Sequence, residues 1–134
     1  IVNNQKIYNF NIVDVNSVGD NKISFFLKNN LKNKSYLEGK KIKLDIKVEK
    51  YKSIKEKNIK NQITKYEISL NLNVKYNIEG SDKKGSFTLK KSGNYNVEDQ
   101  YSQTVNNENN LIESLSDKLV EDIKLNLSEI TNDT

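Results

Sequence analysis

Residues Thr64–Ile78, with the sequence TKYEISLNLNVKYNI, decide the fold of this chain. Every second residue from Tyr66 to Ile78 is apolar, and the residues between them are polar or charged. Successive side chains point to opposite faces of a β-strand, so this pattern predicts one strand with an apolar face and a polar face. Residues 66–78 would span roughly 43 Å at the rise of a strand, more than twice the usual strand length. A strand of that length needs long neighbours and a cover for its apolar face.

Segments on both sides of this stretch predict its neighbouring strands. Residues Lys41–Ser53 alternate in the same way, so the two strands are expected to form a long antiparallel hairpin with the Lys-rich segment Lys52–Gln62 at its tip. After the stretch, GSDKKG at Gly80–Gly85 predicts a turn, because its glycines permit the positive φ of a tight reversal. A fourth strand follows from Ser86 to about Lys91, and we expect Ser92–Asn94 to interrupt it.

The N-terminal region predicts another strand. Residues Lys6–Val15 form it, and their apolar positions change phase between Ile12 and Val13. Such a slip indicates either a β-bulge or a strand that is buried on both faces. A turn is expected at Asn16–Asn21, around Gly19.

Two segments have helical periodicity. Asp20 is the expected N-cap of a helix that runs to about Lys32, and its apolar residues at helical spacing are Ile23, Phe26, Leu27 and Leu31. A longer amphipathic helix is predicted from about Tyr101 to Ile130. The segment TVNNENN near its start contains poor helix formers, so we expect this helix to fray or to begin late.

The resulting element order is β-α-β-β-β-α. This order predicts an α+β fold, a two-layer sandwich in which a four-stranded mixed sheet carries both helices on one face. The first two strands are expected to be parallel through a right-handed crossover, and the last three to form an antiparallel meander. Residues 1–134 are expected to be a single domain, with 1–5 as a lead-in and 131–134 as a tail.

The composition excludes several kinds of chemistry. Lys and Asn each occur 22 times, and the chain contains no Arg, Ala, Pro, His, Cys, Met or Trp. Without Cys and His there is no disulfide, no thiol nucleophile, no Ser–His pair and no ordinary zinc site. The net charge of +4 comes entirely from Lys, and in so biased a chain scattered lysines are most simply a solubilising surface.

Several groups of residues have both a functional and an ordinary interpretation. The Lys-rich tip could bind phosphate groups or could simply be a solvated hairpin end. The tyrosines could stack on bases, although Tyr66 and Tyr76 are in phase with core residues. Asp45 with Glu67, or Glu98 with Asp99, could be a catalytic carboxylate pair, but cross-strand ion pairing is the ordinary interpretation of the first. We therefore expect no enzyme activity, no cofactor and no metal site.

Four features together cover nearly the whole chain. They are the short helix DNKISFFLKNNLKN, the strand pair KIKLDIKVEKY and TKYEISLNLNVKYNI, the strand GSFTLKKSGNYNV, and the closing helix NNENNLIESLSDKLVEDIKLNLSEI with Asp122, Ile123 and Leu127 near its end. In these four features the chain resembles the LPS-assembly lipoprotein family, LptE.

This resemblance implies a non-catalytic role in lipopolysaccharide export. Proteins of this family are held at the periplasmic face of the Gram-negative outer membrane by a lipidated N-terminal Cys. They plug an outer-membrane β-barrel, LptD, as a 1:1 heterodimer and help to deliver lipopolysaccharide. The anchor would precede Ile1. Neither nucleic acid nor a cofactor is an expected partner.

The resemblance also implies two sets of site residues. In this family, basic residues bind lipopolysaccharide near the tip between the second and third strands and near the start of the last helix. At the start of the last helix this chain has Gln103, Asn106 and Asn107 where a basic residue is expected, so Lys90 and Lys91 become candidates instead. The expected lipopolysaccharide-binding residues are Lys55, Lys57, Lys60, Lys90 and Lys91, and the expected barrel-facing residues are Lys43, Lys47, Asn71, Asn73 and Lys75.

Two other function classes stay open on the residues alone. A basic nucleic-acid-binding module would bind with a steep salt dependence. A periplasmic ligand-binding domain would need a sizeable apolar pocket, and only 34% of the residues are hydrophobic.

Overall fold

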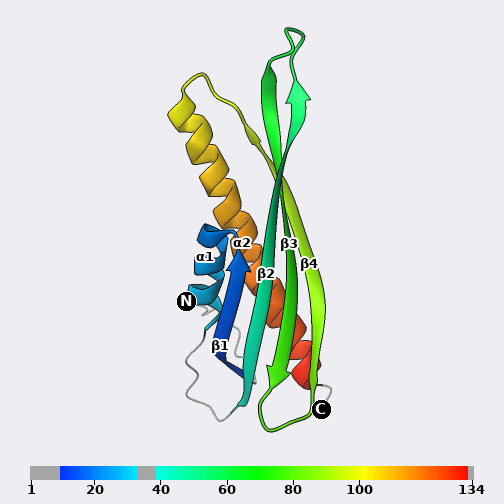
Figure 1. Cartoon of the computed structure of the whole chain (residues 1–134). Coiled ribbons are helices and arrows are strands. Elements are labelled where there is room, and N and C mark those ends of the chain that lie inside the picture. Colours follow the sequence, from blue (N-terminus) through cyan, green and yellow to red (C-terminus); the bar gives the residue numbers. More distant parts are fainter. Residues whose placement is uncertain (1–9, 33–38, 133–134) are drawn as a thin grey trace, which may run out of the picture.

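The computed structural model describes residues 10–32 and 39–132. Its sheet has the strand order β1-β2-β3-β4, in which β1 and β2 are parallel and the other neighbours are antiparallel (Figure 1). The predicted α+β sandwich and element order are therefore confirmed. The elements are β1 Phe10–Gly19, α1 Asn21–Leu31, β2 Lys40–Lys57, β3 Ile63–Ile78, β4 Lys84–Asn96 and α2 Tyr101–Asn132.

Both helices lie on the same side of the sheet, α1 against β1 and α2 against β4 (Figure 1), and their buried side chains form one core with the apolar residues of β3. On β3, Ile68, Leu70, Leu72 and Val74 are at most 1% exposed. On α2, three buried leucine and isoleucine side chains pack in the same core: Leu119, Ile123 and Leu127. Burying each such side chain stabilises a fold by about 1.5–3 kcal/mol, so the alternation of β3 is what holds the two layers together.

Strand β1 contains the predicted bulge but is longer than predicted. Its pairing with β2 shifts register between Ile12 and Asp14, which confirms the bulge interpretation. The predicted turn at Asn16–Asn21 is wrong, because pairing continues to Gly19 opposite Val48. Gly19 has φ +114°, and a Cβ there would lie 2.0 Å from the Val48 carbonyl oxygen. Only glycine permits this close approach at the end of the strand.

Helix α1 begins where the sequence predicts. The Asp20 side chain accepts a hydrogen bond of 3.0 Å from the backbone N–H of Ile23, which is the expected N-cap. The predicted apolar stripe faces the core, with Ile23, Leu27 and Leu31 buried and Phe26 half-buried.

Helix α2 is continuous from Tyr101 onwards, so the predicted frayed or late start is wrong. The Thr104 hydroxyl accepts a 2.8 Å hydrogen bond from the Glu98 N–H, and Asn107 donates one of 3.1 Å to the Asn96 carbonyl. These side chains satisfy backbone groups of the preceding loop and offset the poor helix propensity of the first turns. The predicted tail is also wrong for residues 131–132, because α2 includes them and buries Thr131.

Two strands extend further than predicted. β2 continues to Lys57, so most of the supposed hairpin tip is strand. β4 continues through Ser92–Asn94 without a register shift, so the predicted interruption is wrong. Gly93 lies inside β4 because α2 approaches closely there, and a Cβ at this position would lie 2.6 Å from Leu111 Cδ1.

Some predictions fall outside the described residues. They are the lead-in at 1–5, the part of the first strand at 6–9 with Tyr8, and the last two residues of the tail, 133–134.

Candidate functional site

The face of the sheet that carries no helix, which we call the outer face, is polar except for the exposed side chains of Val18 and Tyr51. Lys47 of β2 stands opposite Asn73 of β3, and Lys75 of β3 stands opposite Asp45. All five residues predicted to face a barrel lie on this face of two neighbouring strands, and all but the half-buried Asn71 are exposed: Lys43, Lys47, Asn71, Asn73 and Lys75. The structure therefore brings this predicted set together.

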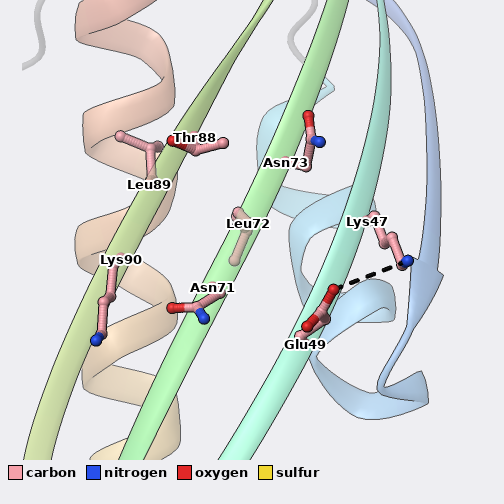
Figure 2. Close-up of a pocket in the computed structure, with 8 residues that line it drawn as sticks. All are labelled: Lys47, Glu49, Asn71, Leu72, Asn73, Thr88, Leu89 and Lys90. Carbon is pink, nitrogen blue, oxygen red and sulfur yellow. Dashed lines mark ion pairs between the residues drawn. The ribbon is translucent and has the colours of Figure 1, made fainter.

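A shallow open hollow of about 430 Å³ lies in the middle of the outer face (Figure 2). Figure 2 shows Lys47 and Glu49 as an ion pair of 3.8 Å on β2, with Asn71 on β3 and Lys90 on β4 at the other side. The Oδ1 atom of Asn71 is buried and has no hydrogen-bond partner among the described residues. The hollow is thus lined by amide groups and by side chains of both charges, which suits a polar surface better than an apolar ligand.

Charges on the outer face are unevenly balanced. Lys43 pairs with Glu79 at 3.4 Å, and Tyr51 donates to the Glu49 carboxylate, a hydrogen bond that raises the pKa of Tyr51. These acidic residues lie near β2, whereas no carboxylate of the described residues lies within 4 Å of Lys75, Lys84 or Lys90. The side of the outer face towards β4 is therefore positively charged.

The hairpin of β2 and β3 projects beyond the helices and ends in an ordered turn (Figure 1). The Oδ1 atom of Asn58 accepts hydrogen bonds of 3.0 Å from the N–H groups of Lys60 and Gln62. Asn61 adopts φ +64°, the left-handed conformation that Asn tolerates well. A single asparagine side chain therefore holds the loop that presents the tip.

The tip combines unpaired cations with an apolar apex. Lys55 pairs with Glu67 at 3.7 Å, but no carboxylate of the described chain lies within 4 Å of Lys57 or Lys60. Between these two lysines, Ile59 is fully exposed, and Ile54 is 51% exposed. Neither isoleucine was among the predicted site residues, because both lie inside a charged segment. The signal in the sequence was the presence of apolar residues in a segment predicted to be an exposed tip.

The two remaining candidate lysines point in opposite directions. Lys90 lies on the outer face opposite Asn71, whereas Lys91 lies opposite Leu70 on the helix-covered side and forms an ion pair of 3.2 Å with Asp122 of α2. Lys90 is also about 25 Å from the tip, as judged from the rise of the intervening strand. The five predicted lipopolysaccharide-binding lysines therefore do not form one cluster.

Lys52 was expected in the Lys-rich tip, but it lies inside β2 and connects the hairpin to α2. Its ammonium group lies 4.5 Å from the ring centroid of Tyr66, 5.6 Å from that of Tyr95 and 3.5 Å from the Glu108 carboxylate. The neighbouring Tyr95 phenol raises the pKa of Lys52, and burial raises the pKa of Tyr95. We call Lys52, Tyr66, Tyr95 and Glu108 the Lys52 clamp. The clamp positions the first half of α2 against the hairpin.

Other candidate groups do not assemble into a site. Tyr66 and Tyr95 stack on each other at 5.6 Å and pack against the core, so they form no platform on the outer face. Asp45 and Glu67 stand opposite Lys75 and Ser53 and are well separated along the sheet. Among the described residues no cluster of acidic side chains could hold a metal ion.

A small crevice of about 170 Å³ lies between α1 and α2, next to Phe26 and Ile112. It is too small for the ligand pockets of about 300–1,000 Å³ that carrier proteins use. Within the described chain, no helix has the length and apolar character that crossing a membrane requires.

Comparison with known proteins gives a likeness of fold. No protein-family model and no curated protein sequence matches the chain. Solved structures do match. The chain shares its fold with bacterial lipoproteins.

Three of these structures cover most of both chains. Rare lipoprotein B from Shewanella oneidensis matches with a TM-score of 0.62 at 8% identity, over 87% of this chain and 95% of that one. A protein assigned as a lipoprotein in Caulobacter crescentus matches with a TM-score of 0.65 at 11% identity, over 90% and 92%. Lipoprotein B from Nitrosomonas europaea matches with a TM-score of 0.54 at 13% identity, over 92% and 85%. The predicted likeness is thus found at the level of fold.

Proposed function

We propose that this protein is a non-catalytic lipoprotein of the outer membrane that plugs an LptD-like β-barrel, assists its assembly and takes part in lipopolysaccharide export. The observation that carries the proposal is the polar outer face on the fold of rare lipoprotein B, another name for LptE. A sheet covered on one side only needs either water or a polar partner on the other side.

The interior of a large β-barrel is such a polar partner. Barrel walls alternate apolar residues towards lipid with polar residues towards the lumen. Lys47, Asn73 and Lys75 would face these residues from a stiff sheet, while the helices would keep the apolar side of the sheet dry. We propose a 1:1 heterodimer in which the outer face contacts the lumen wall.

The tip is the part of the molecule that suits lipopolysaccharide best. Lys57 and Lys60 supply charges for phosphate groups, and Ile59 between them supplies apolar surface for acyl chains. We propose that these three residues bind lipopolysaccharide, with Lys55 and Lys90 as secondary contacts. Lys91 has a structural role in this proposal because it is held by Asp122.

The structural neighbours also favour a membrane location. All three are described as lipoproteins, so we propose that a lipidated Cys upstream of Ile1 holds this protein at the periplasmic face of the outer membrane. Mass spectrometry of the protein from its native membrane tests this directly. A lipid-modified N-terminal peptide is expected, and an unmodified N-terminus would contradict the anchor.

Co-purification with the barrel tests the plug. In one variant, Lys47→Glu/Lys75→Glu reverses two charges on the outer face. The matched control, Lys28→Glu/Lys118→Glu, makes the same charge change at exposed positions of the helices. We expect the wild-type protein and the control to retain a tagged barrel. The outer-face variant should retain less than about a tenth as much, which corresponds to a loss of about 1.4 kcal/mol in binding free energy. Equal retention by both variants, or no retention by the wild type, would contradict the proposal.

Lipopolysaccharide binding is tested at the tip in the same way. Lys57→Glu/Lys60→Glu is compared with the same helix control in a titration with labelled lipopolysaccharide. A loss confined to the tip variant supports the proposed site. An unchanged affinity of the tip variant would show that lipopolysaccharide binds elsewhere or not at all.

A further inference from the structure

Strand β4 has a free edge whose hydrogen-bonding groups can be assigned. The Val97 N–H donates to the Thr64 carbonyl at 2.9 Å, and the Ile78 N–H donates to the Lys83 carbonyl at 3.1 Å. Both contacts fit the register of β3 and β4, so the backbone N–H and C=O groups of the odd-numbered residues in this segment point to β3. The backbone N–H and C=O groups of the even-numbered residues therefore point away from the sheet, at Lys84, Ser86, Thr88, Lys90, Ser92, Asn94 and Asn96.

Most of these outward groups are unused within the described chain. Only the Asn96 carbonyl has a partner there, the side chain of Asn107. The other six outward residues are exposed, and no described residue forms a backbone hydrogen bond with them from the free side. Their spacing is regular, because the pairing of β4 with β3 has no register shift from Lys84 to Asn96.

The other edges of the sheet are less suitable for a new strand. β1 is interrupted by its bulge at Val13. Beyond Val48, β2 also has a free side, but its register shifts after Ile54, and the side chains of Lys50 and Lys52 are tied to the helices. A bulge is a common device against strand addition. The lysines of the β4 edge are another, and they would disfavour any partner strand that lacks acidic residues. β4 lacks a bulge along its entire length.

The two sides of the β4 edge differ in character: one is positively charged and the other is apolar. On the outer face, Lys75, Lys84 and Lys90 have no carboxylate within 4 Å among the described residues. On the helix side, Phe87 and Leu89 of β4 are only partly buried and pack against the core. An added strand would therefore meet lysines on one of its faces and apolar side chains on the other.

We propose that the β4 edge binds an extended segment of another protein, which adds to the sheet as a fifth strand. The segment carries acidic residues on the side of the outer face and apolar residues on the side of Phe87 and Leu89. Its backbone bonds the outward groups of β4, and its alternating side chains provide specificity. The inference does not depend on the proposed role in lipopolysaccharide export, because it uses only the edge and its charges.

Amide hydrogen exchange with a defined peptide tests the proposal. The probe is a ten-residue peptide of alternating Glu and Val, and the control peptide has Lys in place of Glu. On addition of the acidic peptide we expect at least tenfold slower exchange at the amides of Ser86, Thr88, Lys90 and Ser92, with little change at Phe87 and Leu89, which already bond β3. The basic peptide is expected to give no such protection.

Two variants separate charge from backbone pairing. Lys84→Glu/Lys90→Glu is expected to weaken the acidic peptide at least tenfold and leaves every backbone group in place. Thr88→Pro removes one outward N–H, at a type of position where proline is tolerated, and is expected to weaken both the affinity and the protection. If the proline variant does not fold, the charge variant still decides the question.

Three results would overturn the proposal. The first is no protection of the outward amides at millimolar acidic peptide. The second is equal binding of the acidic and basic peptides, which would remove the charge argument. The third is that, without any peptide, these amides become more protected from exchange as the protein concentration rises. This result would show that a second copy of the chain occupies the edge.

Discussion

Replacement of Lys52 by Ala should release α2 from the hairpin and destabilise the protein. The Lys52 ammonium contacts two tyrosine rings on the sheet and the Glu108 carboxylate on α2. The substitution removes all three contacts together, and it leaves the stacked pair of Tyr66 and Tyr95 without its cation. Because Glu108 lies in the first turns of α2, the loss should be felt most in that part of the helix.

The magnitude follows from the individual contacts. A cation over an aromatic ring at a partly exposed site contributes about 0.5–1 kcal/mol, and the contact with Tyr66 is the closer of the two. The ion pair with Glu108 adds about 0.2–1 kcal/mol, at the lower end because the Lys52 side chain is 43% exposed. We therefore expect Lys52→Ala to reduce the free energy of unfolding by about 1.5 kcal/mol.

Lys50→Ala is the matched control. Lys50 forms a similar ion pair of 3.4 Å with Asp20, its side chain is 34% exposed, and it has no ring contact. The Asp20 cap is retained, because Oδ1 bonds Ile23 whereas Oδ2 meets Lys50. Urea unfolding should give a loss of about 0.5 kcal/mol for this control. Equal losses in both variants would refute the role of the rings, and unchanged hydrogen exchange around Glu108 would refute the clamp.

Two further predictions concern backbone strain and alkaline pH. Gly19→Ala should reduce the free energy of unfolding in urea by about 3 kcal/mol, because φ is +114° and the new Cβ clashes with the Val48 carbonyl. Gly80→Ala should reduce it by about 1 kcal/mol, because φ is +75° but the space around Gly80 is open. Similar losses in the two variants would contradict the clash at Gly19. The pKa of Lys52 and that of Tyr95 are both raised above their ordinary values of 10.5 and 10.0, so the stability they contribute is complete below about pH 10 and is lost as pH rises through the folded values. The melting temperature should accordingly fall above pH 10, and in Lys52→Met the Tyr95 phenol should titrate at still higher pH in an absorbance titration, because Lys52 lowers the pKa of Tyr95.

The fold could be predicted from sequence where a local pattern and its tertiary role agree. The alternation of β3, the Asp20 cap and the phase slip at Ile12 each have one simple structural meaning, and the structure contains all three. The extension of β2 to Lys57 could not be predicted, because its charged residues are ordered only by pairing with β3. Likewise, the regular course of β4 through Gly93 depends on the close approach of Leu111, a contact distant in sequence.

The candidate site was partly predictable for the same reason. The barrel-facing residues were chosen by alternation, and alternation correctly places them on one face. Lys91 was chosen by proximity to Lys90, although its phase with Leu89 and Tyr95 already indicated the helix-covered side. The Lys52 clamp and the exposed Ile59 depend on which residues α2 reaches and where the turn begins, and neither is visible in a local pattern.

The side of the sheet on which a lysine lies separates structural lysines from candidate functional ones. On the helix-covered side, each of five lysines is held by a group outside the sheet: Lys40, Lys50, Lys52, Lys83 and Lys91 contact Thr131, Asp20, Glu108, Ile130 and Asp122. On the outer face, lysines pair only with residues of the sheet or of the adjoining turn, or have no carboxylate within 4 Å in the described chain. Charge reversal on the first side should therefore reduce stability, whereas reversal on the second should leave the fold intact. A composition biased towards Lys cannot distinguish these two roles, but the register of the strands can, and it directs every functional test to the outer face, the tip and the β4 edge.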